Sequence, residues 1–287
     1  MITITEKQTI TDLLGRYVKK YGSQNKASAS LSVSSAVVSQ MINHKWELIA
    51  DEMWRKVAAK IGYTNKDWVV VQTRDFKLIT STLKDAQENS NVYAITGDAG
   101  SGKSRAISEY AVSHKRVYLL HCNEFWNRKQ FLVELLKEMG RDASGFTVAE
   151  LMNEIVRILK QQDRPLIIMD EADKIKDQVL YFFITLYNSL EDQCGIILIA
   201  TSHLEKRINK GVRVDRRGFR EIYSRIGRRF IQLKGVGSTD VQQICLANGV
   251  EDHKAIKEIY QDCEGDLRRV KRKVHAWKMI QKQTKMN

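Results

Sequence analysis

The chain of 287 residues contains one proline and four cysteines. The cysteines lie far apart and include no close pair suited to zinc binding or redox chemistry, so we expect reduced thiols. No apolar run is long enough to cross a bilayer, and the N-terminus lacks the basic start and apolar segment of a secretory signal. These absences predict a cytoplasmic or nucleoid-associated protein of a bacterial cell, without a membrane partner.

Acidic residues are scarce relative to basic ones. Lysine and arginine together number 47 against 34 acidic residues, which gives a formal net charge of +13. Such a chain gains affinity for nucleic acid by displacing condensed counterions, and anionic membrane lipid is the weaker alternative. Between Leu204 and Arg229 ten residues are basic and three are acidic. We expect this segment to face DNA through Lys206, Arg207, Lys210, Arg213, Arg216 and Arg217.

The stretch from Gly97 to Ser104 matches the complete nucleotide-binding P-loop pattern. It lies between a predicted strand at 92–96 and a predicted helix that includes 105–111. Glycines let backbone N–H groups surround phosphates, and the helix N-terminus adds partial positive charge. Lys103 is then expected to reach the outer phosphates of ATP, and the Ser104 hydroxyl to coordinate Mg²⁺. The predicted cofactor-binding residues of this loop are Gly97, Asp98, Ala99, Gly100, Ser101, Gly102, Lys103, Ser104 and Arg105.

A second motif follows in the apolar segment Leu166–Asp170, which predicts a buried strand that ends in a carboxylate. Asp170 is expected to hold Mg²⁺ together with Ser104. Glu171, one residue further, is placed to polarise the attacking water. Together the two motifs predict a magnesium-dependent ATPase that converts ATP to ADP and phosphate.

Four parts are predicted along the chain. Strands alternate with helices from about residue 73 to 235, a pattern that favours an α/β fold with a parallel sheet between helices. The predicted strands cover 92–96, 116–121, 166–170, 195–201 and 230–233. Residues 1–65 predict an all-α domain, residues 66–72 a linker, and residues 236–287 a helical lid that ends in a basic helix. The basic face of that last helix is either a second DNA surface or a solvated helix face.

Residues 25–43 predict two short helices joined by a tight turn, with Ser34 as the cap of the second helix. The arrangement resembles the helix-turn-helix of phage repressors, although Ser32 replaces the usual turn glycine. Small or hydrogen-bonding side chains on the second helix suit base edges in a major groove. They are Ser35, Ala36, Ser39 and Gln40, with Lys45 just beyond the helix. A helical packing module that does not touch DNA is the alternative.

Three landmarks follow the two motifs: the apolar segment 196–202, Tyr-Ser-Arg-Ile at 223–226, and Gly-Asp-Leu-Arg-Arg at 265–269. Their order resembles the AAA+ ATPases across residues 73–280. The resemblance implies that Ser202, or its neighbour Thr201, is the sensor-1 residue near the γ-phosphate. It further implies that Arg225 is an arginine finger for a neighbouring subunit and that Arg268 is the sensor-2 arginine of the lid. Both arginines could instead be surface or DNA-contacting residues.

Within the AAA+ ATPases, a helix-turn-helix followed by a compact ATPase and a short lid looks like the phage Mu B and transposon target-DNA-capture family. The resemblance implies binding to double-stranded DNA with little sequence preference and ATP-dependent assembly into a helical filament or ring. It also implies delivery of that DNA to an integrase-core transposase, with hydrolysis driving release. A helicase loader or replication initiator, and an ATP-switched transcription regulator, are the alternative functions.

Overall fold

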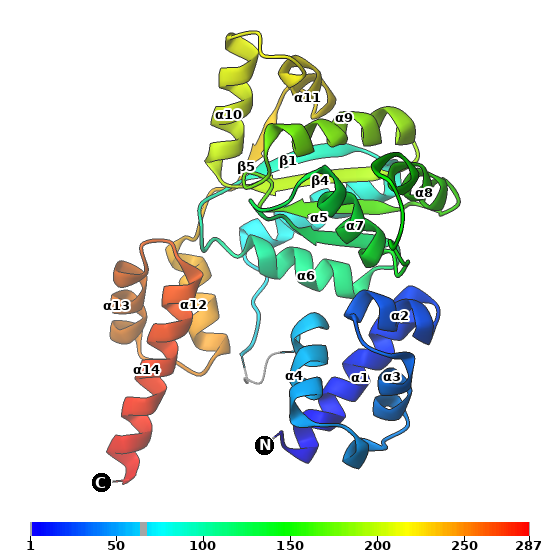
Figure 1. The fold of residues 1–287 in the computed structure, drawn as a ribbon. Helices are drawn as coiled ribbons and strands as arrows, with labels where there is room; N and C mark the ends of the chain where they lie inside the picture. Colours follow the sequence, from blue (N-terminus) through cyan, green and yellow to red (C-terminus); the bar gives the residue numbers. More distant parts are fainter. Residues whose placement is uncertain (1, 64–67, 287) are drawn as a thin grey trace.

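The computed structural model describes residues 2–63 and 68–286. In this part of the chain, five parallel strands form one sheet in the order β2-β3-β4-β1-β5 (Figure 1). The strand β4 therefore lies between the P-loop strand β1 and the strand β3 that ends in Asp170. The predicted parallel α/β fold is confirmed. The strands are β1 (Val92–Thr96), β2 (Val117–His121), β3 (Leu166–Asp170), β4 (Gly195–Ala200) and β5 (Phe230–Gln232).

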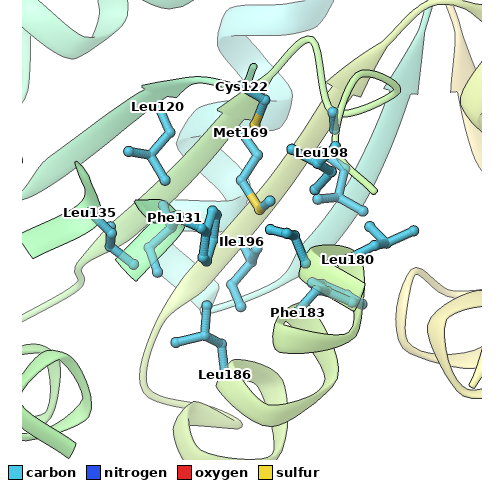
Figure 2. Packing of buried hydrophobic residues seen from close by; sticks show 14 of the residues in the cluster. Leu120, Cys122, Phe131, Leu135, Met169, Leu180, Phe183, Leu186, Ile196 and Leu198 are labelled. Atoms are coloured by element: carbon cyan, nitrogen blue, oxygen red, sulfur yellow. The ribbon is translucent and has the colours of Figure 1, made fainter. Parts of the chain in front are cut away.

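Helices cover both faces of the sheet, and for that reason β3 and β4 are buried at every position and apolar except for Asp170 at the end of β3. Alternate residues of β3 point to opposite faces, so Ile168 packs with one buried cluster and Met169 with the other. Figure 2 shows the larger cluster, in which Phe131 and Phe183 lie against strand residues. The helices α5 (Arg74–Asn89) and α6 (Lys103–Ser113) cover one face, and α7 (Arg128–Glu138), α8 (Val148–Lys160) and α9 (Asp177–Leu190) cover the other.

The basic segment after β4 forms two helices that the sequence did not predict, α10 (Ser202–Arg213) and α11 (Phe219–Arg225). Their apolar side chains, among them Leu204 and Ile222, are fully buried in the larger cluster. The two helices approach closely at Gly211, where an added Cβ would lie 2.4 Å from the Phe219 ring. This helical hairpin lies at the top of Figure 1, away from the two chain termini.

Beyond β5 the chain is helical, with α12 (Ser238–Ala247), α13 (His253–Cys263) and α14 (Leu267–Met286). Their contacts form a separate buried cluster that includes Val241, Ile244 and Val270. Of the predicted linker, residues 66 and 67 lie outside the described residues, as do residues 64 and 65 of the predicted first domain. Trp68 and Val71 pack against the cluster of these C-terminal helices.

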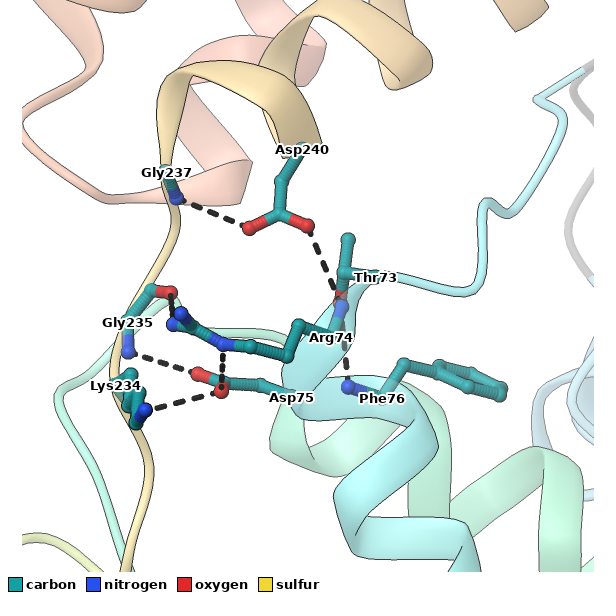
Figure 3. Close-up of polar contacts among 8 residues, drawn as sticks. All are labelled: Thr73, Arg74, Asp75, Phe76, Lys234, Gly235, Gly237 and Asp240. Atoms are coloured by element: carbon teal, nitrogen blue, oxygen red, sulfur yellow. Dashed lines mark hydrogen bonds and ion pairs between the residues drawn. The ribbon is translucent and has the colours of Figure 1, made fainter.

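The connection between β5 and α12 is fixed to the start of α5 by carboxylates (Figure 3). Asp75 is 3% exposed and accepts a hydrogen bond from the N–H of Gly235 at 2.8 Å. Asp240 accepts from the N–H groups of Arg74 at 3.3 Å and Gly237 at 3.0 Å. A buried carboxylate is tolerated here because backbone donors satisfy it. These bonds set the position of the C-terminal helices relative to the sheet.

The N-terminal helices have a core of their own, which includes Leu14, Val38, Met41 and Trp54. Ser34 caps the third helix as predicted, because its hydroxyl accepts a hydrogen bond from Val37 at 3.3 Å. The turn before it places Ser32 at φ +54°, a conformation that costs a non-glycine residue about 1 kcal/mol. The elements are α1 (Ile4–Tyr21), α2 (Gln24–Leu31), α3 (Ser35–Ile42), the 3₁₀ turn η1 (Trp46–Leu48) and α4 (Asp51–Lys60).

The N-terminal helices contact the α/β domain through α6 and α7. Tyr21 Oη donates a hydrogen bond to Glu138 Oε2 at 3.5 Å. Burial raises the pKa of Glu138, and the nearby Lys20 and Lys60 oppose that shift.

Within residues 2–63 and 68–286, no helix has the length and apolarity needed to cross a bilayer.

Candidate active site

The P-loop connects β1 to α6 and wraps around the ammonium group of Lys103. Lys103 Nζ donates hydrogen bonds to the carbonyl oxygens of Gly97 and Asp98, each at 2.7 Å. Gly100 and Gly102 have φ angles of +82° and +92°, where glycine is favoured. Burial lowers the pKa of Lys103, and the Asp170 carboxylate opposes that shift. The ammonium group therefore lies at the mouth of the loop, next to the N-terminus of α6, where phosphates would bind.

The predicted metal ligands lie together at the carboxyl ends of the strands. Ser104 Oγ donates a hydrogen bond to Asp170 Oδ2 at 2.9 Å, and Asp170 is 2% exposed. His121 Nδ1, at the end of β2, lies 3.3 Å from the same carboxylate oxygen. The hydrogen bond to Asp170 raises the pKa of His121. Hydroxyl and carboxylate oxygens are the ligands that Mg²⁺ prefers, so the pair Ser104 and Asp170 fits this ion.

Glu171 begins a sharp turn after β3. Its φ angle is +54°, which is uncommon for a residue other than glycine and typical of functional sites. The Glu171 carboxylate lines the same cavity as the P-loop and forms an ion pair with Lys174 at 2.7 Å. Because both partners are about half exposed, this ion pair is a weak constraint, and the carboxylate is able to turn toward a bound nucleotide.

The two sensor-1 candidates, Ser202 and Thr201, lie differently relative to the cavity. Thr201 lines the cavity, and its hydroxyl donates a hydrogen bond to Asp173 at 2.6 Å. Since β4 ends at Ala200 and Thr201 caps α10, Ser202 is already the first helical residue. Ser202 does not line the cavity. Of the two neighbouring candidates, Thr201 is the one whose side chain lines the cavity.

The cavity has a volume of about 350 Å³ and two chemically different ends. The P-loop, Asp170 and Glu171 form the polar end. The apolar end is formed by residues 68–71, by α5 and by the lid, with the side chains of Trp68, Val70, Val71, Phe76 and Ile244 in its lining. Leu267 lies against the P-loop, beside Gly102. Sites of this size with a few polar groups in an apolar wall are typical of nucleotide-sized ligands. Residues 68–71 belong to the predicted linker, and the one signal of their place in this wall is their apolar run after a polar stretch.

The lid closes directly on the P-loop. Leu267 N–H, at the start of α14, donates a hydrogen bond to the Gly100 carbonyl at 2.9 Å. The Asp266 side chain fills the space beside Gly100, because an added Cβ would lie 2.2 Å from Asp266 Oδ1. Arg268 lines the cavity, and its charge contributes to lowering the pKa of Lys103. Arg268 and Lys103 are therefore brought to the same end of the cavity.

Arg225 lies at the other edge of the sheet. It lines a second cavity together with Asn91 and Val92, at the amino end of β1. Its guanidinium donates to Asn188 Oδ1 at 2.7 Å, lies 3.4 Å from Glu221, and is 5.3 Å from the centre of the Tyr187 ring. Since the P-loop follows the carboxyl end of β1, Arg225 is remote from the nucleotide cavity of its own chain.

The residues expected to contact DNA fall into two groups. Arg207 donates to Asp177 and to the Ile175 carbonyl, and Arg216 forms an ion pair with Asp177 at 2.6 Å. These two arginines therefore hold the hairpin to the start of α9. Of the residues expected to contact DNA from the hairpin, Lys206, Lys210, Arg213 and Arg217 are exposed, and Arg216 is exposed despite its ion pair. On the N-terminal helices, Ser35, Ala36 and Lys45 are exposed, and Ser39 and Gln40 are partly exposed.

Comparison with known proteins gives relatives over most of the chain. Residues 86–208 match the family described as an AAA domain. The chain is 24% identical over 243 residues to the Mu-like prophage FluMu DNA transposition protein B of Haemophilus influenzae, covering 82% of this chain and 83% of that protein. It is 23% identical over 239 residues to the ATP-dependent target DNA activator B of Escherichia phage Mu, covering 80% and 75%. Among solved structures, Cdc6p from Pyrobaculum aerophilum aligns with a TM-score of 0.47 and 15% identity, covering 64% of this chain and 50% of that chain.

The contact between lid and P-loop predicts a selective effect of Gly100→Ala. The new Cβ would collide with Asp266, so the lid shifts and ATP affinity falls by about tenfold or more, as expected for a lost buried hydrogen bond. Gly145→Ala is the matched control, because Gly145 has a similar φ of +80° but nothing within 4 Å of its added Cβ. Titration with a fluorescent ATP analogue measures both variants. Equal ATP affinity in the two variants would contradict the lid contact.

Proposed function

We propose that this AAA+ ATPase, a relative of the Mu-like transposition proteins B, is an ATP-switched clamp for target DNA. It binds double-stranded DNA with little sequence preference, assembles on it as a homo-oligomer in the form of a filament or ring, and delivers it to an integrase-core transposase. Hydrolysis of ATP then releases the DNA. The names of both sequence relatives refer to transposition or to target DNA. They favour this function over a helicase loader, a replication initiator or a transcription regulator.

The proposed ATPase activity is supported by one observation. Four side chains line the same cavity, and they are Lys103, Ser104, Asp170 and Glu171. Glu171 accepts a proton from the water whose oxygen attacks the γ-phosphorus, and the bond between that phosphorus and the bridging oxygen of ADP breaks. Lys103 and the lid residue Arg268 are adjacent to the charge that develops on the phosphates. Mg²⁺ supplies further charge neutralisation when Ser104 and Asp170 hold it. Thr201 is the proposed sensor-1 residue.

The DNA-binding part is supported by the exposed cations of the α10–α11 hairpin. Lys206, Lys210 and Arg213 follow the spacing of one helix face, so they form a stripe on α10, and Arg217 extends it into the turn. A stripe of this kind binds phosphates along a backbone and carries no sequence information. We propose that the exposed residues of α3 and Lys45 are a secondary DNA contact.

The proposed oligomer is supported by the position of Arg225. Its side chain is 19% exposed and lies at the edge of the sheet opposite to the P-loop. If subunits stack with that edge against a neighbour's nucleotide cavity, Arg225 acts in trans as an arginine finger. Contact with the transposase is proposed to stimulate hydrolysis in this assembled state.

Glu171→Gln is expected to bind ATP and DNA but to hydrolyse ATP about 100-fold more slowly, because the group that accepts the proton of the attacking water is lost. Phosphate release at saturating ATP and DNA measures the rate, and a fluorescent ATP analogue measures binding. Glu124→Gln removes an exposed carboxylate from the neighbouring β2–α7 loop and should leave the rate unchanged. Normal turnover in Glu171→Gln would remove Glu171 from the mechanism.

Combined substitution of Lys206 and Lys210 by alanine is expected to weaken DNA binding and to reduce the slope of log affinity against log salt by about 2, close to one unit for each lost phosphate contact. Electrophoretic mobility shifts at several salt concentrations, with and without ATP, provide the measurement. The matched control replaces Lys254 and Lys257, exposed lysines of α13, by alanine. An unchanged slope refutes the hairpin surface, and equal binding without ATP refutes the switch.

Arg225→Ala subunits alone and Lys103→Ala subunits alone are both expected to lack DNA-stimulated ATPase activity. Their mixture should recover activity, because an Arg225→Ala subunit keeps an intact nucleotide site and receives Arg225 from a Lys103→Ala neighbour. Arg220→Ala is the control on the same helix, since Arg220 is 70% exposed and pairs only with Asp215 among the described residues. Full activity of Arg225→Ala by itself would show that Arg225 is not the finger.

A further inference from the structure

The segment before α5 is attached to the lid by one buried amide. Asn248, just after α12, is 3% exposed. Its Oδ1 accepts a hydrogen bond from Val69 N–H at 2.9 Å, and its Nδ2 donates to the Val69 carbonyl at 3.0 Å. Nδ2 also donates to the Ile244 carbonyl at 2.8 Å. The Asn248 side chain thus pairs with both backbone groups of Val69, in the way that a neighbouring strand would.

The residues on both sides of this attachment contribute to the nucleotide cavity. Trp68, Val70 and Val71 line its apolar end, and Trp68 and Val71 also pack on the buried cluster of the lid. Lys271 Nζ lies 5.4 Å from the centre of the Trp68 ring, a cation–π contact that ties the ring to α14. We refer to residues 68–71 as the strap. The apolar wall of the cavity is therefore built jointly by the strap and the lid.

The strap continues into the contacts shown in Figure 3. Thr73 caps α5 by accepting a hydrogen bond from Phe76 N–H at 3.2 Å, and Phe76 lines the cavity. Asp75 is held to Gly235 in the connection between β5 and α12. The chain is thus fixed at the base of the lid through Asp75 and on the lid itself through Asn248. A rotation of the lid about this connection would carry the strap with it.

We propose that Asn248 is a positioning residue for the nucleotide base. It holds the strap on the lid. The apolar wall of the cavity and Arg268, which lines the cavity, then keep one arrangement relative to each other. An aromatic base at the apolar end would lie between strap and lid, while the phosphates lie on the P-loop. The proposal rests on the ATP site proposed above, but it does not depend on DNA or a transposase. Loss of Asn248 should weaken the binding energy that comes from the base of ATP and leave the binding energy that comes from its phosphates unchanged.

The test compares ATP with inorganic tripolyphosphate, which presents phosphates without a base. For Asn248→Ala, competition against a fluorescent ATP analogue should show ATP affinity reduced by about tenfold, as expected for the loss of buried hydrogen bonds, while tripolyphosphate affinity stays nearly constant. Val69→Ala is the matched control: the Val69 side chain is 51% exposed and the backbone hydrogen bonds to Asn248 remain possible, so neither affinity should change. An unchanged ratio of the two affinities in Asn248→Ala overturns the proposal.

Thermal melting shows whether Asn248→Ala folds. If it does not, Trp68→Ala decides the matter, because it removes the aromatic part of the wall and leaves the Asn248 amide in place. The same selective loss of ATP affinity is expected, and an unchanged ratio in Trp68→Ala likewise overturns the proposal. Failure of the ATP site itself would differ from both results, since the unmodified protein would then bind neither ATP nor tripolyphosphate.

Discussion

The five parallel strands end at the same edge of the sheet, and this common direction brings the residues of the candidate active site together. At that edge the P-loop follows β1, Asp170 and Glu171 follow β3, and Thr201 follows β4. The Ser104–Asp170 hydrogen bond crosses the end of the intervening strand β4 and joins the two motifs. The opposite edge carries Arg225. The sheet therefore separates the nucleotide cavity from Arg225, as the proposed head-to-tail assembly requires.

The sheet supplies only the polar end of the cavity. The apolar end comes from α5, from the lid and from residues 68–71, which are linked by hydrogen bonds between distant parts of the chain. Such buried polar contacts fix one arrangement, because each group would lose its partner if the lid moved independently of residues 68–71. The lid and residues 68–71 are thus joined by specific contacts, whereas the shape of the P-loop is set by local backbone geometry, with Gly100 and Gly102 at positive φ.

Local patterns were sufficient to predict much of this site. The strands Val92–Thr96 and Leu166–Asp170 were predicted with their observed bounds, because each is a short apolar run next to a motif of fixed spacing. The hairpin α10–α11 was missed, since its many charges concealed the buried positions such as Leu204 and Phe219. Residues 68–71 were predicted as part of a linker, but their place in the cavity wall was not predicted, because their partner Asn248 is remote in sequence and only folding brings the two together.

The net charge of a segment indicates its candidate DNA-contacting residues less well than the contacts of each charged side chain do. Arg207 and Arg216 looked equivalent to Lys206 and Lys210 in the sequence, yet both arginines contact Asp177 and stabilise the hairpin. A guanidinium that is already paired must give up hydrogen bonds before it can bind a phosphate, whereas an exposed lysine gives up only water and counterions. The exposed stripe on α10 is therefore a better candidate for the proposed DNA contact than the basic segment as a whole, because Asp177 already holds the paired arginines.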